Sequence, residues 1–269
     1  MSRIDAALRD LRSLEALAAR DTALARLDAR AKVVATLVFI VTVVSFDRYA
    51  VAALMPLAAF PLALAMLGEL PARPLLRKLL FAAPFAVLVG LFNPLLDRAP
   101  MLAFGAVHVS AGWVSFASIL VRFALTVGAA LVLVAGTGMN TLCVALTRLG
   151  VPPVMTTQLL FLFRYAFVLG AEAARTSTAR ELRSNGRAMA LAAYGPLLGH
   201  LLLRAFERAQ RIHLAMLARG FDSELRSLRT LRWSTRDTVF VAGWSAFFLL
   251  VRLIDLPQWA GRVLLGAAP

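Results

Sequence analysis

The chain is built around long runs of apolar residues that short polar stretches separate. Such runs cover Val33–Phe46, Tyr49–Gly68, Leu79–Leu96, Trp113–Gly138 and Thr238–Val251. A transmembrane helix needs about 20 mainly apolar residues, so each run predicts one span, and the first must also use Ala29 to Lys32. The pattern therefore predicts an all-α integral membrane protein with about five transmembrane helices.

Prolines and charged residues interrupt this pattern. We expect Lys32 to extend to the membrane interface and Pro56 and Pro61 to kink the second span, because proline removes a backbone donor. The segment Asn93–Gly112 contains turn-forming residues and predicts an external loop. Arg122 interrupts the fourth span, and a charge inside a membrane helix is a candidate functional residue. Pairing inside the bundle or extension to the interface is the more common explanation, and both interpretations remain open.

A segment of about a hundred residues, 137–236, separates the fourth and fifth spans and predicts a module of long amphipathic helices. Thr141–Leu149 has the pattern of a short helix that Gly150 ends. A second helix is expected from Pro153 to about Ser184, and a third from about Pro196 to Gly220. The stretch Leu159–Leu169 is apolar enough for a sixth span, but we expect it to pack along the membrane face of the bundle.

Positive charge assigns these segments to sides of the membrane. The whole chain has 29 Lys and Arg against 15 Asp and Glu, and residues 137–236 alone hold 14 Arg against 5 acidic residues. Because cytoplasmic loops are enriched in Lys and Arg, the sequence predicts a multi-pass protein of the cell membrane. Four parts follow, namely a cytoplasmic segment 1–30, spans one to four in 31–136, a cytoplasmic module 137–236, and the last span with the C-terminus in 237–269.

Composition also excludes several classes of function. With 60% hydrophobic and 16% charged residues, the chain is not an ordinary soluble domain. Its basic residues lie mostly outside the apolar runs and on one predicted side of the membrane, which argues against nucleic acid as their partner. His108, His200, His213 and Cys143 show no ligand spacing, so we expect no metal site. The spans lack the gathered ionisable residues of an intramembrane enzyme, and no phosphate-binding loop is present.

Two helix ends in the module carry the candidate functional residues. Leu182, Arg183 and Ser184 precede Asn185-Gly186, while Ala218, Arg219 and Gly220 end the third helix. Each end presents one arginine between small or apolar residues. Arginine in a last helical turn also complements the helix dipole, so either arginine taken alone is explained without a partner.

Taken together, these features resemble the transmembrane (T) component of an energy-coupling factor (ECF) transporter. Arg211–Gly220, which reads RIHLAMLARG, and Glu181–Gly186, which reads ELRSNG with Leu182 and Ser184 in place of the usual Ala and Gly, resemble the two signatures of that family. Within the family, the cobalt-type CbiQ branch is the most similar, through the segments Leu27–Lys32, Val44–Phe46 and Arg148–Pro152.

The resemblance implies a subunit that transmits motion and catalyses no reaction. It implies that Arg183 and Arg219 each contact one of two ATP-binding-cassette ATPase subunits, which bind the ATP, and that a substrate-capture membrane subunit holds the metal. The chain itself then needs no cofactor, and its other partner is the lipid bilayer. The expected cargo is cobalt ions. The alternatives are nickel or a vitamin as cargo, or a self-sufficient secondary transporter.

Overall fold

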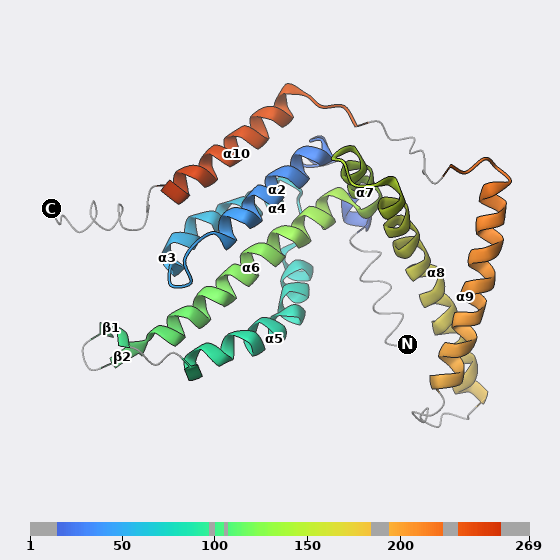
Figure 1. Cartoon of the computed structure of the whole chain (residues 1–269), viewed down its shortest axis with the longest axis horizontal. Helices are drawn as coiled ribbons and strands as arrows, with labels where there is room; N and C mark the ends of the chain where they lie inside the picture. Colours follow the sequence, from blue (N-terminus) through green and yellow to red (C-terminus); the bar gives the residue numbers. More distant parts are fainter. Residues whose placement is uncertain (1–14, 97–99, 105–106, 184–193, 223–230, 254–269) are drawn as a thin grey trace. The chain divides into compact units, whose positions relative to one another are not determined.

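The computed structural model describes residues 15–96, 100–104, 107–183, 194–222 and 231–253 (Figure 1). These residues are helical apart from one hairpin and short connections. The elements in chain order are α2 (Ala29–Val44), α3 (Val51–Leu54), η1 (Met55–Ala58), α4 (Ala59–Leu67), α5 (Ala72–Leu96), β1 (Pro100–Phe104), β2 (Val107–Ser110), α6 (Ala111–Thr137), α7 (Met139–Arg148), α8 (Pro153–Arg183), α9 (Tyr194–Leu217) and α10 (Thr235–Leu253).

The chain forms two compact units, which we describe separately. The first, called the helix module, comprises Met1–Ala19 and Gly138–Thr230, and the second, called the bundle, comprises Arg20–Thr137 and Leu231–Pro269. In the bundle, α6 packs against α2, α3, α4 and α5, while α10 packs against α2 and η1. In the helix module, α8 packs against both α7 and α9.

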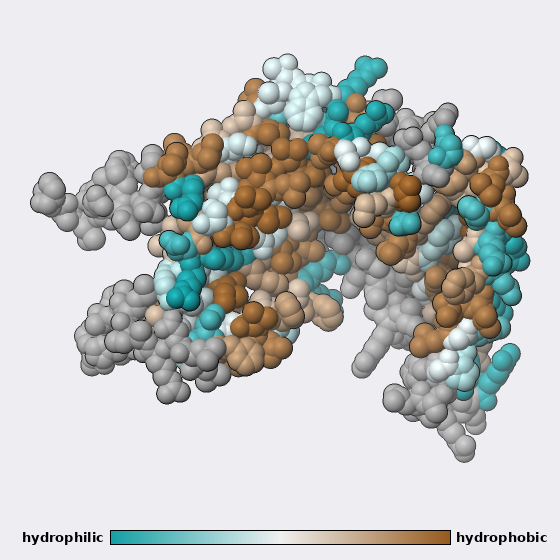
Figure 2. Space-filling view, viewed as in Figure 1, coloured by the Kyte–Doolittle hydropathy of each residue, from teal (hydrophilic) through white to brown (hydrophobic). Residues whose placement is uncertain are grey.

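An aromatic cluster forms the centre of the bundle. Phe39, Phe60 and Phe248 are fully buried, and the ring of Phe39 lies 4.8 Å from that of Phe60 and 5.4 Å from that of Phe248, measured between centroids. By contrast, α5 exposes large apolar side chains, among them Phe81 at 89% and Phe85 at 72%. Figure 2 shows hydrophobic residues over much of the visible surface of the bundle. A surface of this kind suits a lipid environment, where apolar side chains need no cover.

The chain is a multi-pass helical protein by the length and composition of its helices. Three stretches among the described residues are long and apolar enough to cross a membrane, namely Ala72–Pro94, Ala111–Thr137 and Pro153–Arg180. The apolar helix Val51–Leu67 is shorter, and α2 has 16 residues. The third of the long stretches is α8, which the sequence had placed along the membrane face.

The segment predicted as an external loop, Asn93–Gly112, is largely structured. Helix α5 continues to Leu96, and β1 and β2 form an antiparallel hairpin in which Phe104 pairs with Val107. This short hairpin is a local exception in an otherwise helical chain, and the alternating β-branched residues of VHVS favour its second strand. The link Glu69–Lys78 is likewise mostly helical, since α5 already begins at Ala72.

The second predicted span is not one continuous α-helix, and the irregular turn lies at Pro56. This proline lies in η1, a single 3-10 turn between α3 and α4, where its missing N–H does not break an α-helical hydrogen bond. Pro61 lies in the first turn of α4, where the backbone N–H groups have no helical acceptor in any case. Only one of the two prolines therefore interrupts the helix.

Two basic residues of the bundle donate to backbone carbonyls. Arg122 is partly buried and donates from Nη2 to the carbonyl oxygen of Phe46 at 2.9 Å and also to that of Asp47. Both carbonyls belong to the connection that follows α2, so the arginine has hydrogen-bond partners within the bundle. Lys32 does not extend to the interface as predicted. Its side chain is only 3% exposed and donates from Nζ to the carbonyl oxygen of Leu24 at 3.2 Å.

Candidate functional site

Helices α8 and α9 form an antiparallel pair, which carries both predicted arginine contacts. In the second half of α8, Glu172 lies beside Arg204 in the first half of α9, whereas Phe161, earlier in α8, lines the same cavity as Met216 near the end of α9. Residue numbers therefore rise along one helix as they fall along the other. We call these two helices the helix pair (Figure 1).

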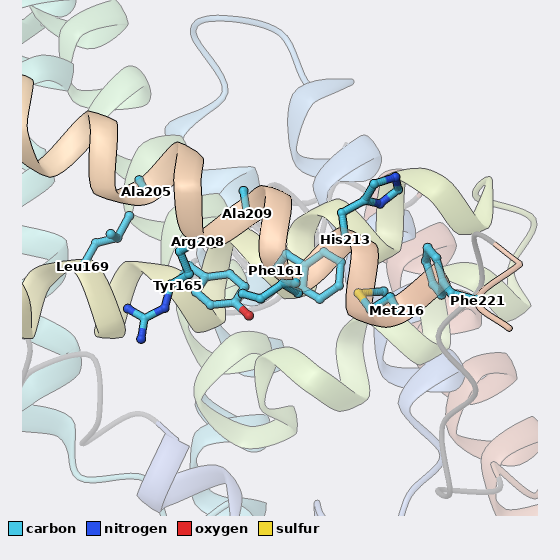
Figure 3. A pocket seen from close by; sticks show the side chains of 10 residues that line it. Phe161, Tyr165, Leu169, Ala205, Arg208, Ala209, His213, Met216 and Phe221 are labelled. Carbon is cyan, nitrogen blue, oxygen red and sulfur yellow. The ribbon is translucent and has the colours of Figure 1, made fainter. Parts of the chain in front are cut away.

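An apolar cavity of about 400 Å³ lies between the two helices (Figure 3). Its lining residues are Phe161, Tyr165, Leu169, Ala205, Arg208, Ala209, Ile212, His213, Met216 and Phe221. Small residues on α9, such as Ala205 and Ala209, face large ones on α8, so the two backbones approach without filling the space between them. Phe161 and Tyr165 are the aromatic residues that α8 contributes to this lining.

One carboxylate links the helices beyond the cavity. Oε1 of Glu172 lies 2.7 Å from Nη1 of Arg204, and Oε2 lies 3.8 Å from Nη1 of Arg208. The Glu172 side chain is 18% exposed and that of Arg204 is 53% exposed. Solvent screens such a pair, and its contribution to stability is about 1 kcal/mol or less. The ion pair therefore fixes the register of the helices more than it holds them together.

The end of α9 has a defined geometry that presents Arg219. The N–H of Phe221 donates to the carbonyl of Met216, and the N–H of Gly220 donates to that of Leu217, both at 3.0 Å. This is the Schellman arrangement, in which the residue after the cap takes the left-handed conformation, and Gly220 has a φ of +78°. Phe221 and Met216 also share the cavity. The helix stop predicted at Gly220 is confirmed, and Ala218, Arg219 and Gly220 are all exposed.

The other predicted contact lies at the opposite end of the helix pair. Arg183 is the last residue of α8, and it is exposed together with Leu182, whose exposed fraction is 78%. Ser184 lies outside the described residues. Counting from the level of Glu172 and Arg204 with a rise of 1.5 Å per residue, Arg183 and Arg219 stand about 40 Å apart. They cannot contact one common small ligand.

The described residues contain no group of three or more His, Cys, Asp or Glu side chains placed to hold a metal ion. His213 is the one histidine among the residues lining the cavity, beside apolar and aromatic neighbours. Sequence reasoning missed the partnership of Glu172 with Arg204, because 32 residues separate them and no motif relates them. The only sequence signal was their shared placement on the polar sides of two amphipathic helices.

Comparison with known proteins identifies the family. The model of the CbiQ family, described as cobalt transport protein, matches residues 20–230. The chain belongs to the CbiQ family. It is 37% identical over 68 residues to the energy-coupling factor transporter transmembrane protein EcfT of Staphylococcus aureus, covering 24% of this chain and 25% of that protein. It is 27% identical over 107 residues to an uncharacterized protein of Methanocaldococcus jannaschii, covering 39% of this chain and 40% of that one.

The CbiQ-family chain thus spans less than half the length of these curated relatives. Family membership nevertheless confirms the resemblance seen in the sequence. It also agrees with the apolar helices of a multi-pass membrane protein.

Proposed function

We propose that this chain is the T subunit of an ECF-type importer for cobalt ions, with about five spans and a cytoplasmic helix module. In this proposal α8 lies along the cytoplasmic membrane face. The subunit transmits the motion of two ATPase subunits to a membrane subunit that captures the ion. Membership of the CbiQ family supports the transport role and the cargo, and the similarity to an EcfT protein supports the ECF class.

The observation that carries the proposal is the placement of the two arginines. Arg183 is the last residue of α8, Arg219 lies in the turn that closes α9, and both are exposed at opposite ends of the pair. An antiparallel pair presents two such ends to two separate protein surfaces, whereas a single binding site would need both arginines on one side. One arginine for each ATPase subunit is the arrangement that fits this geometry.

Arginine suits the proposed contact better than lysine does. Its planar guanidinium is charged at all physiological pH values and binds a carboxylate through two parallel hydrogen bonds. Arg219 stands between Ala218 and Gly220, so little side-chain volume prevents its insertion into a groove of the ATPase. A carboxylate in that groove would be desolvated together with the arginine.

Closure of the ATPase dimer on ATP then acts on the two ends of the helix pair. Because a helix is stiff along its axis, force applied at Arg183 and Arg219 moves α8 and α9 against each other, and the cavity between them leaves space for such a shift. The helix module passes this motion to the bundle, which bears the substrate-capture subunit. The chain itself binds neither ATP nor the ion.

Reversal of charge at the two helix ends tests the assignment. The double variant Arg183→Glu/Arg219→Glu should insert in the membrane at the wild-type level but lose the ATPase subunits on affinity purification. Removing one partner from a buried ion pair costs about 3–5 kcal/mol, which corresponds to a loss of affinity of at least a hundredfold for each single variant at 1.4 kcal/mol per factor of ten.

A matched control comes from the same helix. Arg175 is an exposed arginine of α8, two turns before Arg183, and Arg175→Glu should retain the ATPase subunits. Equal retention by the double variant and by this control would refute the coupling assignment. Uptake of radioactive cobalt by cells that express the complex, in competition with nickel or vitamins, tests the cargo separately.

A further inference from the structure

The chain passes between the helix module and the bundle three times, after Ala19, after Thr137 and after Thr230. Within the bundle, the residues next to these passages are tied to one another. Leu24 follows the first, Gly136 precedes the second and Asp237 follows the third. All of them lie at the end of the bundle where α2 and α10 begin and α4 and α6 finish.

Asp237 joins the beginnings of two helices with a single carboxylate. Its Oδ2 accepts from the backbone N–H and from Oγ of Ser234, both at 2.8 Å, which is a capping box at the start of α10. Its Oδ1 accepts from the backbone N–H of Asp28 at 2.7 Å. Asp28 is the N-cap of α2 and accepts from the N–H of Arg30. Asp237 is 2% exposed and Asp28 is 6% exposed.

Further contacts hold the chain where it enters α10. The guanidinium of Arg30 lies 5.4 Å from the centre of the Trp233 ring, in the range of a cation–π interaction, and the same side chain forms an ion pair with Asp28 at 2.9 Å. Trp233 donates from Nε1 to Oγ1 of Thr238 at 2.8 Å. The residues before α10 are thus fixed to the start of α2.

Leu24 connects the ends of α4 and α6 to the end of the bundle where α2 and α10 begin. Its side chain is 1% exposed and lies so close to Gly136 that a Cβ at that position would overlap it, while a Cβ on Gly68 would be 3.0 Å away. Its N–H donates to the carbonyl of Leu67 at 3.1 Å, and its carbonyl accepts from Nζ of Lys32. The ends of α4 and α6 therefore contact the loop that leads into α2.

We propose that Leu24, Asp28, Lys32, Gly136 and Asp237 form an entry clasp that fixes the three passages relative to one another, so that motion of the helix module moves the bundle as one body. Asp237 is its main positioning residue. This inference rests on the proposed T-subunit function. Without the clasp, the same motion would be absorbed by the first turns of individual helices, and ATP would be hydrolysed without transport.

The test uses the complete complex of this chain with its ATPase and capture subunits, reconstituted in vesicles with Co²⁺ as the probe. In Asp237→Asn, an amide NH₂ replaces one of the two carboxylate oxygens that accept hydrogen bonds. The NH₂ then faces another donor, so the hydrogen bond at that position is lost. We expect assembly and ATP hydrolysis within about twofold of wild type, but Co²⁺ uptake per ATP reduced at least fivefold. Asp47→Asn, which changes an exposed carboxylate of the bundle, should leave both values unchanged.

Hydrogen exchange supplies a readout that does not depend on the cargo. The amide of Asp28 should exchange at least tenfold faster in Asp237→Asn than in Asp47→Asn. Uptake per ATP equal to that of Asp47→Asn in the assembled complex, or unchanged exchange at Asp28, overturns the clasp. Failure of the wild-type complex to retain ATPases or to import Co²⁺ instead overturns the proposed function.

A second pair of variants decides the question if Asp237→Asn does not assemble. Gly136→Ala removes no hydrogen-bonding group of the clasp but displaces the side chain of Leu24, whereas Gly128→Ala on the same helix adds a Cβ that meets nothing within 4 Å. Lower uptake per ATP for Gly136→Ala than for Gly128→Ala supports the clasp. Equal values overturn it.

Discussion

The contact between Leu24 and Gly136 predicts that Gly136→Ala lowers the stability of the wild-type chain but raises the stability of a chain that carries Leu24→Ala. Leu24→Ala removes a buried side chain whose neighbours include two glycines, and glycines have no side chain that could move into the space. Leucine-to-alanine changes in protein cores cost about 2–5 kcal/mol, more where the site collapses poorly. We therefore expect a loss of about 4 kcal/mol in the free energy of unfolding.

Gly136→Ala alone should also destabilise the chain, for the opposite reason. The added methyl overlaps Leu24, and overpacking costs about 1–3 kcal/mol, against a gain of about 1 kcal/mol from replacing glycine inside a helix. In the Leu24→Ala background the overlap disappears, so the same substitution should stabilise. The double variant should then be more stable than the sum of the single effects by about 1–3 kcal/mol.

The free energy of unfolding can be measured by titrating detergent-solubilised protein with dodecyl sulfate. The four corners of the cycle are wild type, Leu24→Ala, Gly136→Ala and the double variant. A parallel cycle with Gly128→Ala, where the methyl enters open space, should be additive. Additivity within about 0.5 kcal/mol in the Gly136 cycle, or equal coupling in both cycles, would refute the contact.

Two further predictions concern a backbone conformation and a charge. Gly220→Ala places a side chain on a left-handed residue at a cost of about 1–2 kcal/mol, so the last turn of α9 should loosen and fewer ATPase subunits should co-purify. Gly195→Ala, in open space, should retain them; equal recovery from both variants would contradict the role of the helix stop. Burial raises the pKa of Asp28, but the hydrogen bonds and charge of Arg30 and the charge of Lys32 outweigh it and hold the pKa below its usual value. The resulting stability is complete above about pH 4 and is lost as the pH falls through the lowered pKa. Unfolding measured between pH 6 and pH 3 should show this loss in wild type and not in Asp28→Asn; identical pH profiles would exclude it.

Local sequence signals were sufficient for most helices of this chain. Gly220 was expected to end a helix and has the left-handed conformation that does so, as does Gly150 with a φ of +101°. The apolar run from Trp113 predicted α6 to within two residues at its start and one at its end. These features depend on neighbours in sequence, which is why a single chain is enough to predict them.

The features that sequence reasoning missed depend on contacts between distant segments. Lys32 looked like a residue at the membrane interface, and only the position of the Leu24 carbonyl makes its burial possible. Ser234 and Asp237 have the spacing of a capping box and could have been recognised as one, but nothing local indicates that Asp28 shares the carboxylate. The hairpin after α5 was missed because Pro100 and Gly105 favour a loop as much as a turn between strands.

The carboxylate of Asp237 also bears on the order in which the protein is made. It accepts from the amide of Asp28, which precedes it by 209 residues. At a synthesis rate of about 5–20 residues per second, Asp28 leaves the ribosome roughly 10–40 s before its acceptor exists. The hydrogen bond between the start of α2 and Asp237 of α10 therefore forms only after α10 has been synthesised. A truncated chain lacking α10 would leave the amide of Asp28 without its native acceptor. This contact completes only after nearly the whole chain has been synthesised.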